Sequence, residues 1–77
     1  MTVRLFANRI DALIAAENYS VKRGYSREIA RKFSYAAPVR EYGQDTDKWQ
    51  AWAIHHIVNN RVHRRPLLTT QEEGVVA

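Results

Sequence analysis

The feature that most constrains the fold of this 77-residue chain is a long segment, Asp47–Pro66, that contains no glycine and has its only proline at the end. Because nothing inside it breaks a helix, the segment predicts one continuous helix that stops at Pro66. On a helical wheel of about 3.6 residues per turn, apolar side chains share one broad arc, which we expect to face the core. These side chains are Ala51, Ile54, Ile57, Val58 and Val62.

A second side of this helical wheel carries aromatic and hydrogen-bonding groups. It comprises Trp52, His55, His56, Asn59 and His63, with Arg61, Arg64 and Arg65 in the last turn. Tryptophan and arginine dominate protein interfaces, because each combines a large contact area with a polar group. We therefore predict that this set binds a partner and that Trp52 is partly exposed in the free protein. Trp49 lies nearer the Ile57 side of the wheel and is predicted to join the core.

A first helix is predicted near the N-terminus. Apolar residues spaced three and four apart between Val3 and Ile14 predict a helix over residues 5–22, although its first residues would also suit an extended conformation. Lys22 and Arg23 in front of Gly24 are typical of a helix C-terminus, where basic side chains face the negative end of the dipole and glycine tolerates positive φ.

A second helix is predicted to begin after Ser26, whose hydroxyl can accept a hydrogen bond from a backbone N–H of the first turn. We expect this helix to end near Ala37, because Pro38 disfavours helical geometry in the residue before it. Residues 39–46 show no period and predict a loop, with one helical turn at residues 38–42 as an alternative. Asp45 or Thr46 would then cap the third helix.

Together these elements predict an all-α fold, a small three-helix domain arranged as an orthogonal bundle or in the manner of a helix-turn-helix protein. The domain would cover residues 1–66, and residues 67–77 would form a mobile tail unless Leu67 and Leu68 dock. The predicted core consists of Phe6, Ile10, Leu13, Ile14, Ile29, Phe33, Ile54, Ile57, Val58 and one tryptophan.

The charge of the chain favours an anionic partner. Lysine and arginine number 12 against 8 acidic residues, a net charge of +4, and two of those acidic residues, Glu72 and Glu73, lie in the predicted tail. Such a surface attracts either nucleic acid or an acidic protein face. A secondary basic face is predicted on the second helix from Arg27, Arg31 and Lys32.

Several kinds of site are not expected. The absence of cysteine excludes thiolate metal sites and cysteine nucleophiles, and it suits the reducing cytoplasm. No segment approaches the ~20 apolar residues that cross a bilayer, and no signal-peptide pattern opens the chain. No metal site is expected, because His55, His56 and His63 lack the i,i+4 spacing of helical ligand pairs. The glycines are isolated and no nucleophile–base arrangement is recognisable, so we expect neither a cofactor nor enzymatic activity.

One short segment resembles the first helix of helix-turn-helix proteins. In Tyr25–Ser34 an apolar–alanine pair, Ile29-Ala30, is followed three residues later by Phe33, which would let two helices pack closely. The resemblance implies DNA binding, but Pro38 and Gly43 leave barely one turn for a recognition helix. The third helix would then read the DNA, with Asn59, Asn60, His63 and Arg64 at base edges and Arg61 and Arg65 on phosphates.

The sequence therefore supports two hypotheses about function. The first is a non-catalytic regulatory protein of the cytoplasm that docks on a protein component of nucleic-acid machinery, such as transcription, as host-directed proteins of bacterial viruses do. The second is a transcription regulator that binds specific DNA sequences through a helix-turn-helix. The residues leave the identity of the partner and the oligomeric state open.

Overall fold

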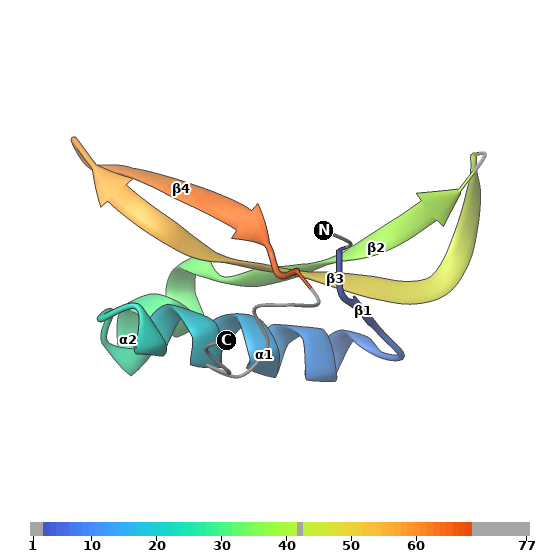
Figure 1. The fold of residues 1–77 in the computed structure, drawn as a ribbon, viewed down its shortest axis with the longest axis horizontal. Coiled ribbons are helices and arrows are strands. Elements are labelled where there is room, and N and C mark those ends of the chain that lie inside the picture. The colour runs from blue at the N-terminus through green and yellow to red at the C-terminus, as the bar shows by residue number, and fades with distance from the viewer. Residues whose placement is uncertain (1–2, 42, 69–77) are drawn as a thin grey trace.

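The computed structural model of the protein describes residues 3–41 and 43–68, and in these ranges it contains two helices and a four-stranded antiparallel sheet (Figure 1). Along the chain the elements are β1 (Leu5–Phe6), α1 (Arg9–Lys22), α2 (Arg27–Phe33), β2 (Tyr35–Glu41), β3 (Gln44–Val58) and β4 (Arg61–Pro66). Both helices lie on one side of the sheet and leave its other side uncovered. The predicted all-α, three-helix fold is therefore wrong, and the fold has one helical layer and one sheet layer.

The segment predicted as the third helix, Asp47–Pro66, instead forms most of β3, a tight turn and β4. Asn59 and Asn60 both have positive φ, 52° and 64°, as a two-residue hairpin turn requires at both central positions. Asparagine tolerates this left-handed conformation better than most residues other than glycine. Tryptophan, isoleucine and valine before the turn pack well on a pleated surface, so the tertiary structure favours the hairpin over the helix.

An irregularity in β3 explains why its apolar residues also match a helical period. The pairing of β3 with β4 shifts register between Ile54 and His56, which is a β-bulge. A bulge inserts an extra residue and interrupts the alternation of side chains between the two faces of the strand. The bulge therefore places Ile54 and Ile57 on the same face although they are three residues apart, a spacing that is also typical of an amphipathic helix.

β3 is the central strand of the sheet. Trp52 pairs with Tyr35 of β2 and also with Pro66 of β4, so β2 and β4 must lie on opposite edges of β3. Gln50 pairs with β2 and also with Leu5 of β1, so β1 lies on the same edge as β4. β1 and β4 therefore follow one another along one edge of β3, and β2 occupies the other edge.

The core between α1 and the sheet is built mainly from small side chains. Its buried members are Phe6, Ala12, Ala16, Ala51, Ala53 and Leu67, and Ala15, Tyr19, Ala36 and Trp49 pack against them. Alanines on both sides of the contact allow the helix to lie close to the strands, since no long side chain separates the two layers.

Several residues predicted for the core lie at the surface instead. Ile10, Ile14, Ile29 and Val58 are exposed, by 65, 50, 37 and 49 %. Leu13, Phe33 and Ile57 are half-buried. The prediction is confirmed for Phe6 and Ile54, and for Trp49, which packs against the core. On α1 the alanines at positions 12 and 16, rather than the isoleucines, face the sheet.

α1 begins later than predicted, at Arg9. Asn8 is its N-cap, and the Asn8 Oδ1 accepts a hydrogen bond from the backbone N–H of Asp11 at 2.9 Å. The first residues of the predicted helix form β1 instead, in keeping with the extended alternative. The predicted C-terminus is confirmed, because α1 ends at Lys22 and Gly24 has a φ of 110°.

α2 begins as predicted but ends early. The Ser26 Oγ accepts a hydrogen bond from the backbone N–H of Ile29 at 3.2 Å, which confirms the N-cap. The helix stops at Phe33 because Tyr35 already pairs with β3. Residues 35–41, predicted as the helix end and a loop, form β2, with Pro38 inside this edge strand. Since a strand follows α2 directly, no recognition helix exists there, and the helix-turn-helix hypothesis is wrong.

The sheet extends beyond the predicted domain boundary. Leu67 is buried, its N–H donates to the carbonyl oxygen of Ala51 and its own carbonyl oxygen accepts from the N–H of Arg4, both at 2.9 Å. Leu68 forms a bridge with Val3. Leu67 and Leu68 therefore dock on the sheet, and the remaining residues of the predicted tail lie outside the described ranges. Neither helix of the described ranges is long and apolar enough to cross a membrane.

A buried serine ties the C-terminal part of α1 to the sheet. The Ser20 Oγ accepts a hydrogen bond from the backbone N–H of Ile54 at 3.0 Å, lies 2.9 Å from the Ser34 Oγ, and donates to the carbonyl oxygen of Ala16 at 2.9 Å. β2 begins only at Tyr35, which pairs with the residue two before Ile54. The hydroxyl of Ser20 therefore supplies the acceptor that a neighbouring strand would otherwise provide.

Candidate binding faces of the β3–β4 ribbon

The ribbon formed by β3 and β4 has two chemically different faces. Ala53 packs in the core on the helix side of β3 and pairs with Arg65, so Arg65 points to the helix side of β4. Side chains two residues apart on a strand share a face, which places His63 and Arg61 on that side as well. Arg64 and Val62 point to the other side, away from the helices.

The predicted binding residues are divided between these faces. We call the side that carries His55, His56, Arg61, His63 and Arg65 the basic face. We call the side turned away from the helices the open face; it carries Leu5, Tyr35, Gln50, Trp52, Ile54, Ile57, Val62, Arg64 and Pro66. Asn59 belongs to neither face, because it forms the turn. The helical wheel that grouped Trp52, His55, His56, Asn59 and His63 on one side is therefore wrong, while the role of the eight predicted residues in binding stays a prediction.

Aromatic rings lie side by side on the open face. The rings of Tyr35 and Trp52 are nearly parallel, at 3°, with centroids 5.9 Å apart. The guanidinium carbon of Arg64 lies 5.3 Å from the centroid of the Tyr35 ring, within the range of a cation–π contact. Tyr35 is 42 % exposed and Trp52 is half-buried. Neither helix shields this face, because both lie on the other side of the sheet (Figure 1).

Arg64 also covers the core from the open face. Its Nε donates a hydrogen bond to the carbonyl oxygen of Phe33. Phe33 directly precedes the segment leading to β2, whereas Arg64 is on β4, so the side chain must cross β3 to reach it. Arg64 pairs with Ile54, whose side chain is fully buried although it belongs to the open face. The aliphatic stem of Arg64 therefore lies over Ile54 and shields it from water.

Arg64→Ala should lower the free energy of unfolding by about 1–3 kcal/mol, because it uncovers Ile54 and leaves the Phe33 carbonyl without this donor. Arg65→Ala is the matched control, since it removes the same side chain from the adjacent position on the other face, and should change stability by about 0.5 kcal/mol or less. Urea denaturation followed by tryptophan fluorescence measures both. Equal losses in the two variants would mean that Arg64 does not cover the core.

The basic face brings three imidazoles together. The ring centroids of His55 and His56 are 4.8 Å apart, and those of His56 and His63 are 4.6 Å apart across the two strands. Partial burial, and then the charges of Arg65 and Arg23, lower the pKa of His55 below its usual 6.5, and the neighbouring histidines act in the same direction. Within the described ranges no group of three or more His, Cys, Asp or Glu side chains is arranged to hold a metal ion.

A cavity of about 260 Å³ opens beside the basic face. His55 and Arg65 form its polar part, and its other lining residues are Tyr19, Ala53, Pro66, Leu67 and Leu68. Most of this lining is apolar or aromatic. A ligand that combined a flat apolar group with a negative charge would find both complements here.

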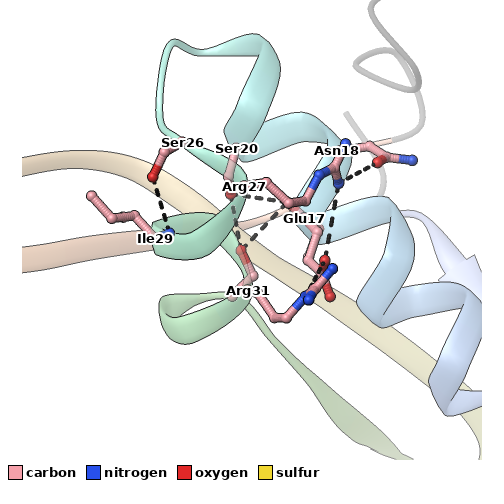
Figure 2. A network of polar contacts seen from close by, with 9 residues as sticks. Glu17, Asn18, Ser20, Ser26, Arg27, Ile29 and Arg31 are labelled. Atoms are coloured by element: carbon pink, nitrogen blue, oxygen red, sulfur yellow. Dashed lines mark hydrogen bonds and ion pairs between the residues drawn. The ribbon is translucent and has the colours of Figure 1, made fainter.

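The secondary basic face is partly neutralised by contacts between the two helices (Figure 2). The Arg27 Nη1 donates to the Asn18 Oδ1 at 2.8 Å and lies 3.9 Å from the Glu17 Oε1, and the Arg31 Nε lies 3.5 Å from the same Glu17 oxygen. The Glu17 side chain is only 13 % exposed, so these ion pairs join α1 to α2 in a partly shielded place. Lys32 lies over the Phe33 ring, 5.3 Å from its centroid. Binding by this surface stays a prediction.

Tyr35 is an aromatic residue of the open face that lies outside the predicted binding set. It pairs directly with Trp52, but the two residues are far apart in sequence and β2 was expected to be the end of a helix. The available signal was alternation along Tyr35-Ala36-Ala37, which is too short to indicate a strand by itself.

Comparison with protein-family models, with curated proteins and with solved structures finds no match for this chain. The function must therefore be inferred from the two faces of the ribbon and from the charge of the chain.

Proposed function

We propose that this protein is a non-catalytic binding protein that docks on a protein component of nucleic-acid machinery through the open face of its sheet. The observation that supports this best is the stacked pair Tyr35–Trp52, which lies with Arg64 on a sheet face that the helices do not cover. Tyrosine, tryptophan and arginine are the side chains most often found at the energetic centre of protein interfaces.

The composition of the open face supports the same proposal. An antiparallel sheet with one solvated face normally alternates apolar and polar side chains, so that the solvated face is polar. Here that face carries Leu5, 50 % exposed, and Tyr35, 42 % exposed, with Ile57, Val62 and Pro66 half-buried beside them. Apolar surface of this kind is costly in water and usually marks a contact with a partner.

The other parts of the proposal follow from the sequence. Regulation of transcription or of related machinery fits the positive charge of the chain, +4, which brings it close to nucleic acid and its acidic protein partners. A cytoplasmic location fits the absence of cysteine. An origin in a bacterial virus fits the small size and the basic character. No nucleophile paired with a base is part of either face, and the proposed role needs no cofactor.

Trp52→Ala should weaken partner binding by about thirtyfold or more, because truncating a central interface tryptophan costs about 2 kcal/mol or more. Immobilised protein is incubated with nuclease-treated lysate, and the captured partner, once identified, is titrated in purified form against each variant by calorimetry. Tyr35→Ala should weaken the same complex, since it removes the ring stacked on Trp52.

Ile14→Ala is the matched control for these variants, because it removes an exposed apolar side chain from α1, in the other layer. Its affinity should equal that of the unmodified protein. Each variant must retain the thermal midpoint within a few degrees for the comparison to hold, and Trp49→Phe should retain binding. An affinity unchanged by both Trp52→Ala and Tyr35→Ala would rule out the open face as the docking surface.

A further inference from the structure

We propose that the basic face of the β3–β4 ribbon is a second binding site, which takes the phosphate groups of a single-stranded nucleic acid. It lies on the opposite side of the ribbon from the open face and does not depend on the protein contact proposed there. The five side chains of the basic face come from two adjacent strands, and the C-terminus of α1 adds Arg23 close to them.

The basic side chains of β4 are regularly spaced along the strand. Arg61, His63 and Arg65 are all exposed and occupy alternate positions on one face of this strand. Alternate residues in an extended strand lie about 7 Å apart. An extended polynucleotide presents one phosphate per nucleotide at a comparable interval, so the two arginines and the histidine between them can each face a phosphate.

The groups that surround His55 on the basic face are all of one charge type. The groups whose charges act on His55 are Arg65 and His63 of β4, Arg23 at the end of α1, and His56 beside it on β3, and all of them are basic. No acidic side chain is among the residues that line the adjoining cavity. Phosphates would relieve the mutual repulsion of these groups, because each phosphate brings negative charge to a surface on which these groups are all basic.

A cavity beside the row of basic groups favours a single strand over a duplex. Its polar residues, His55 and Arg65, belong to the basic face, and its apolar lining includes the ring of Tyr19. An unpaired base can leave the backbone and stack on an aromatic side chain in such a cavity. The bases of a duplex are already stacked and paired, so entering the cavity would require one of them to be extruded.

The imidazole of His55 makes the site sensitive to pH. Partial burial and the neighbouring arginines lower the pKa of His55 from 6.5, so the free protein holds this imidazole neutral near pH 7. A bound phosphate stabilises the imidazolium and raises the same pKa. Proton uptake therefore accompanies binding, and affinity increases as the pH falls below about 6.5.

The test is fluorescence anisotropy with a labelled oligothymidylate, at pH about 7.5 and about 5.5 and over a range of salt concentrations. Arg65→Gln should weaken binding about tenfold and reduce the slope of log affinity against log salt by about one. Arg9→Gln is the matched control: it removes the same charge from an exposed position at the other end of α1 and should leave both quantities nearly unchanged.

His55→Gln should leave affinity at pH about 7.5 within a factor of about two and reduce the increase at pH about 5.5. Trp52→Ala should bind the oligothymidylate as the unmodified protein does, because Trp52 lies on the open face. If Trp52→Ala loses the protein partner but still binds the oligothymidylate, both proposals are supported. Because the two binding measurements are separate, failure of the proposed protein contact can be distinguished from failure of the nucleic-acid site.

Three outcomes would overturn the inference. Equal effects of Arg65→Gln and Arg9→Gln would mean that the net charge of the chain, and not the basic face, attracts the oligonucleotide. Tighter binding to a duplex of the same length would mean that the cavity does not receive an unpaired base. Binding to vesicles that contain phosphatidylserine, at salt concentrations that release the oligothymidylate, would assign the basic face to a lipid surface.

Discussion

Ile54→Ala is expected to lower the free energy of unfolding by about 2–5 kcal/mol, because it opens a cavity at a fully buried position. Ile54 is 0 % exposed and is the largest apolar side chain among the described residues that is completely shielded. Ser20 of α1 accepts a hydrogen bond from the backbone N–H of Ile54, and Arg64 crosses the Ile54 side chain on the open face. Small domains have a total stability of roughly 5–10 kcal/mol, so a large part of it depends on this side chain.

Ile10→Ala is the matched control, since the same substitution is made at a position that is 65 % exposed. It should change the free energy of unfolding by about 0.5 kcal/mol or less. Ile54→Val should lie between them, at about 0.5–1.5 kcal/mol, because it removes a single methylene. Urea denaturation followed by circular dichroism measures all three. A small effect of Ile54→Ala would show that Arg64 and the surrounding chain collapse into the vacated space.

Ser20→Ala is expected to cost about 1–3 kcal/mol, because it leaves the buried N–H of Ile54 without an acceptor. The substitution removes only one oxygen, so packing changes little and the loss reports the hydrogen bonds. Ser34→Ala should cost less, since the Ser34 Oγ makes no hydrogen bond to the edge of β3 and only touches Ser20 and, at 3.5 Å, the carbonyl oxygen of Ala16.

Hydrogen exchange gives a local reading of the same bond. The amide of Ile54 should exchange faster in Ser20→Ala than the loss of global stability accounts for, whereas the amides paired between β3 and β4 should follow global stability. Unchanged relative protection of the Ile54 amide would mean that another group, such as the Ser34 hydroxyl, replaces Ser20 as acceptor.

Local signals along the chain correctly predicted one end of each helix. Ser26 as an N-cap and Gly24 after the end of α1 were both read correctly, because each acts within one helical turn of its own position. The predicted limits failed where a strand competed for the same residues. Leu5 and Phe6 pair with β3 instead of joining α1, and Tyr35 pairs with Trp52 instead of extending α2.

The candidate site was likewise predicted only in part. The five side chains of the basic face, and Trp52 and Arg64 of the open face, were predicted from the abundance of tryptophan, histidine and arginine in one segment. Their distribution between the two faces was not predicted. A helix places Trp52 beside His55, whereas a strand places them on opposite faces, and the bulge between Ile54 and His56 brings His56 to the basic face as well. The choice between these arrangements depends on partners that are distant in sequence.

The sequence alone determined the charge of the protein, the C-terminus of α1, the N-cap of α2 and the kinds of side chain available for binding. These properties belong to single residues or to hydrogen bonds within one turn of the chain. The tertiary structure decided that Asp47–Pro66 forms a hairpin, because strand pairing exchanges hydrogen bonds between segments, and its gain depends on neighbours such as β2 and α1. It also decided which side chains share a face, since one bulge in β3 reverses the alternation that separates an aromatic surface from a basic one.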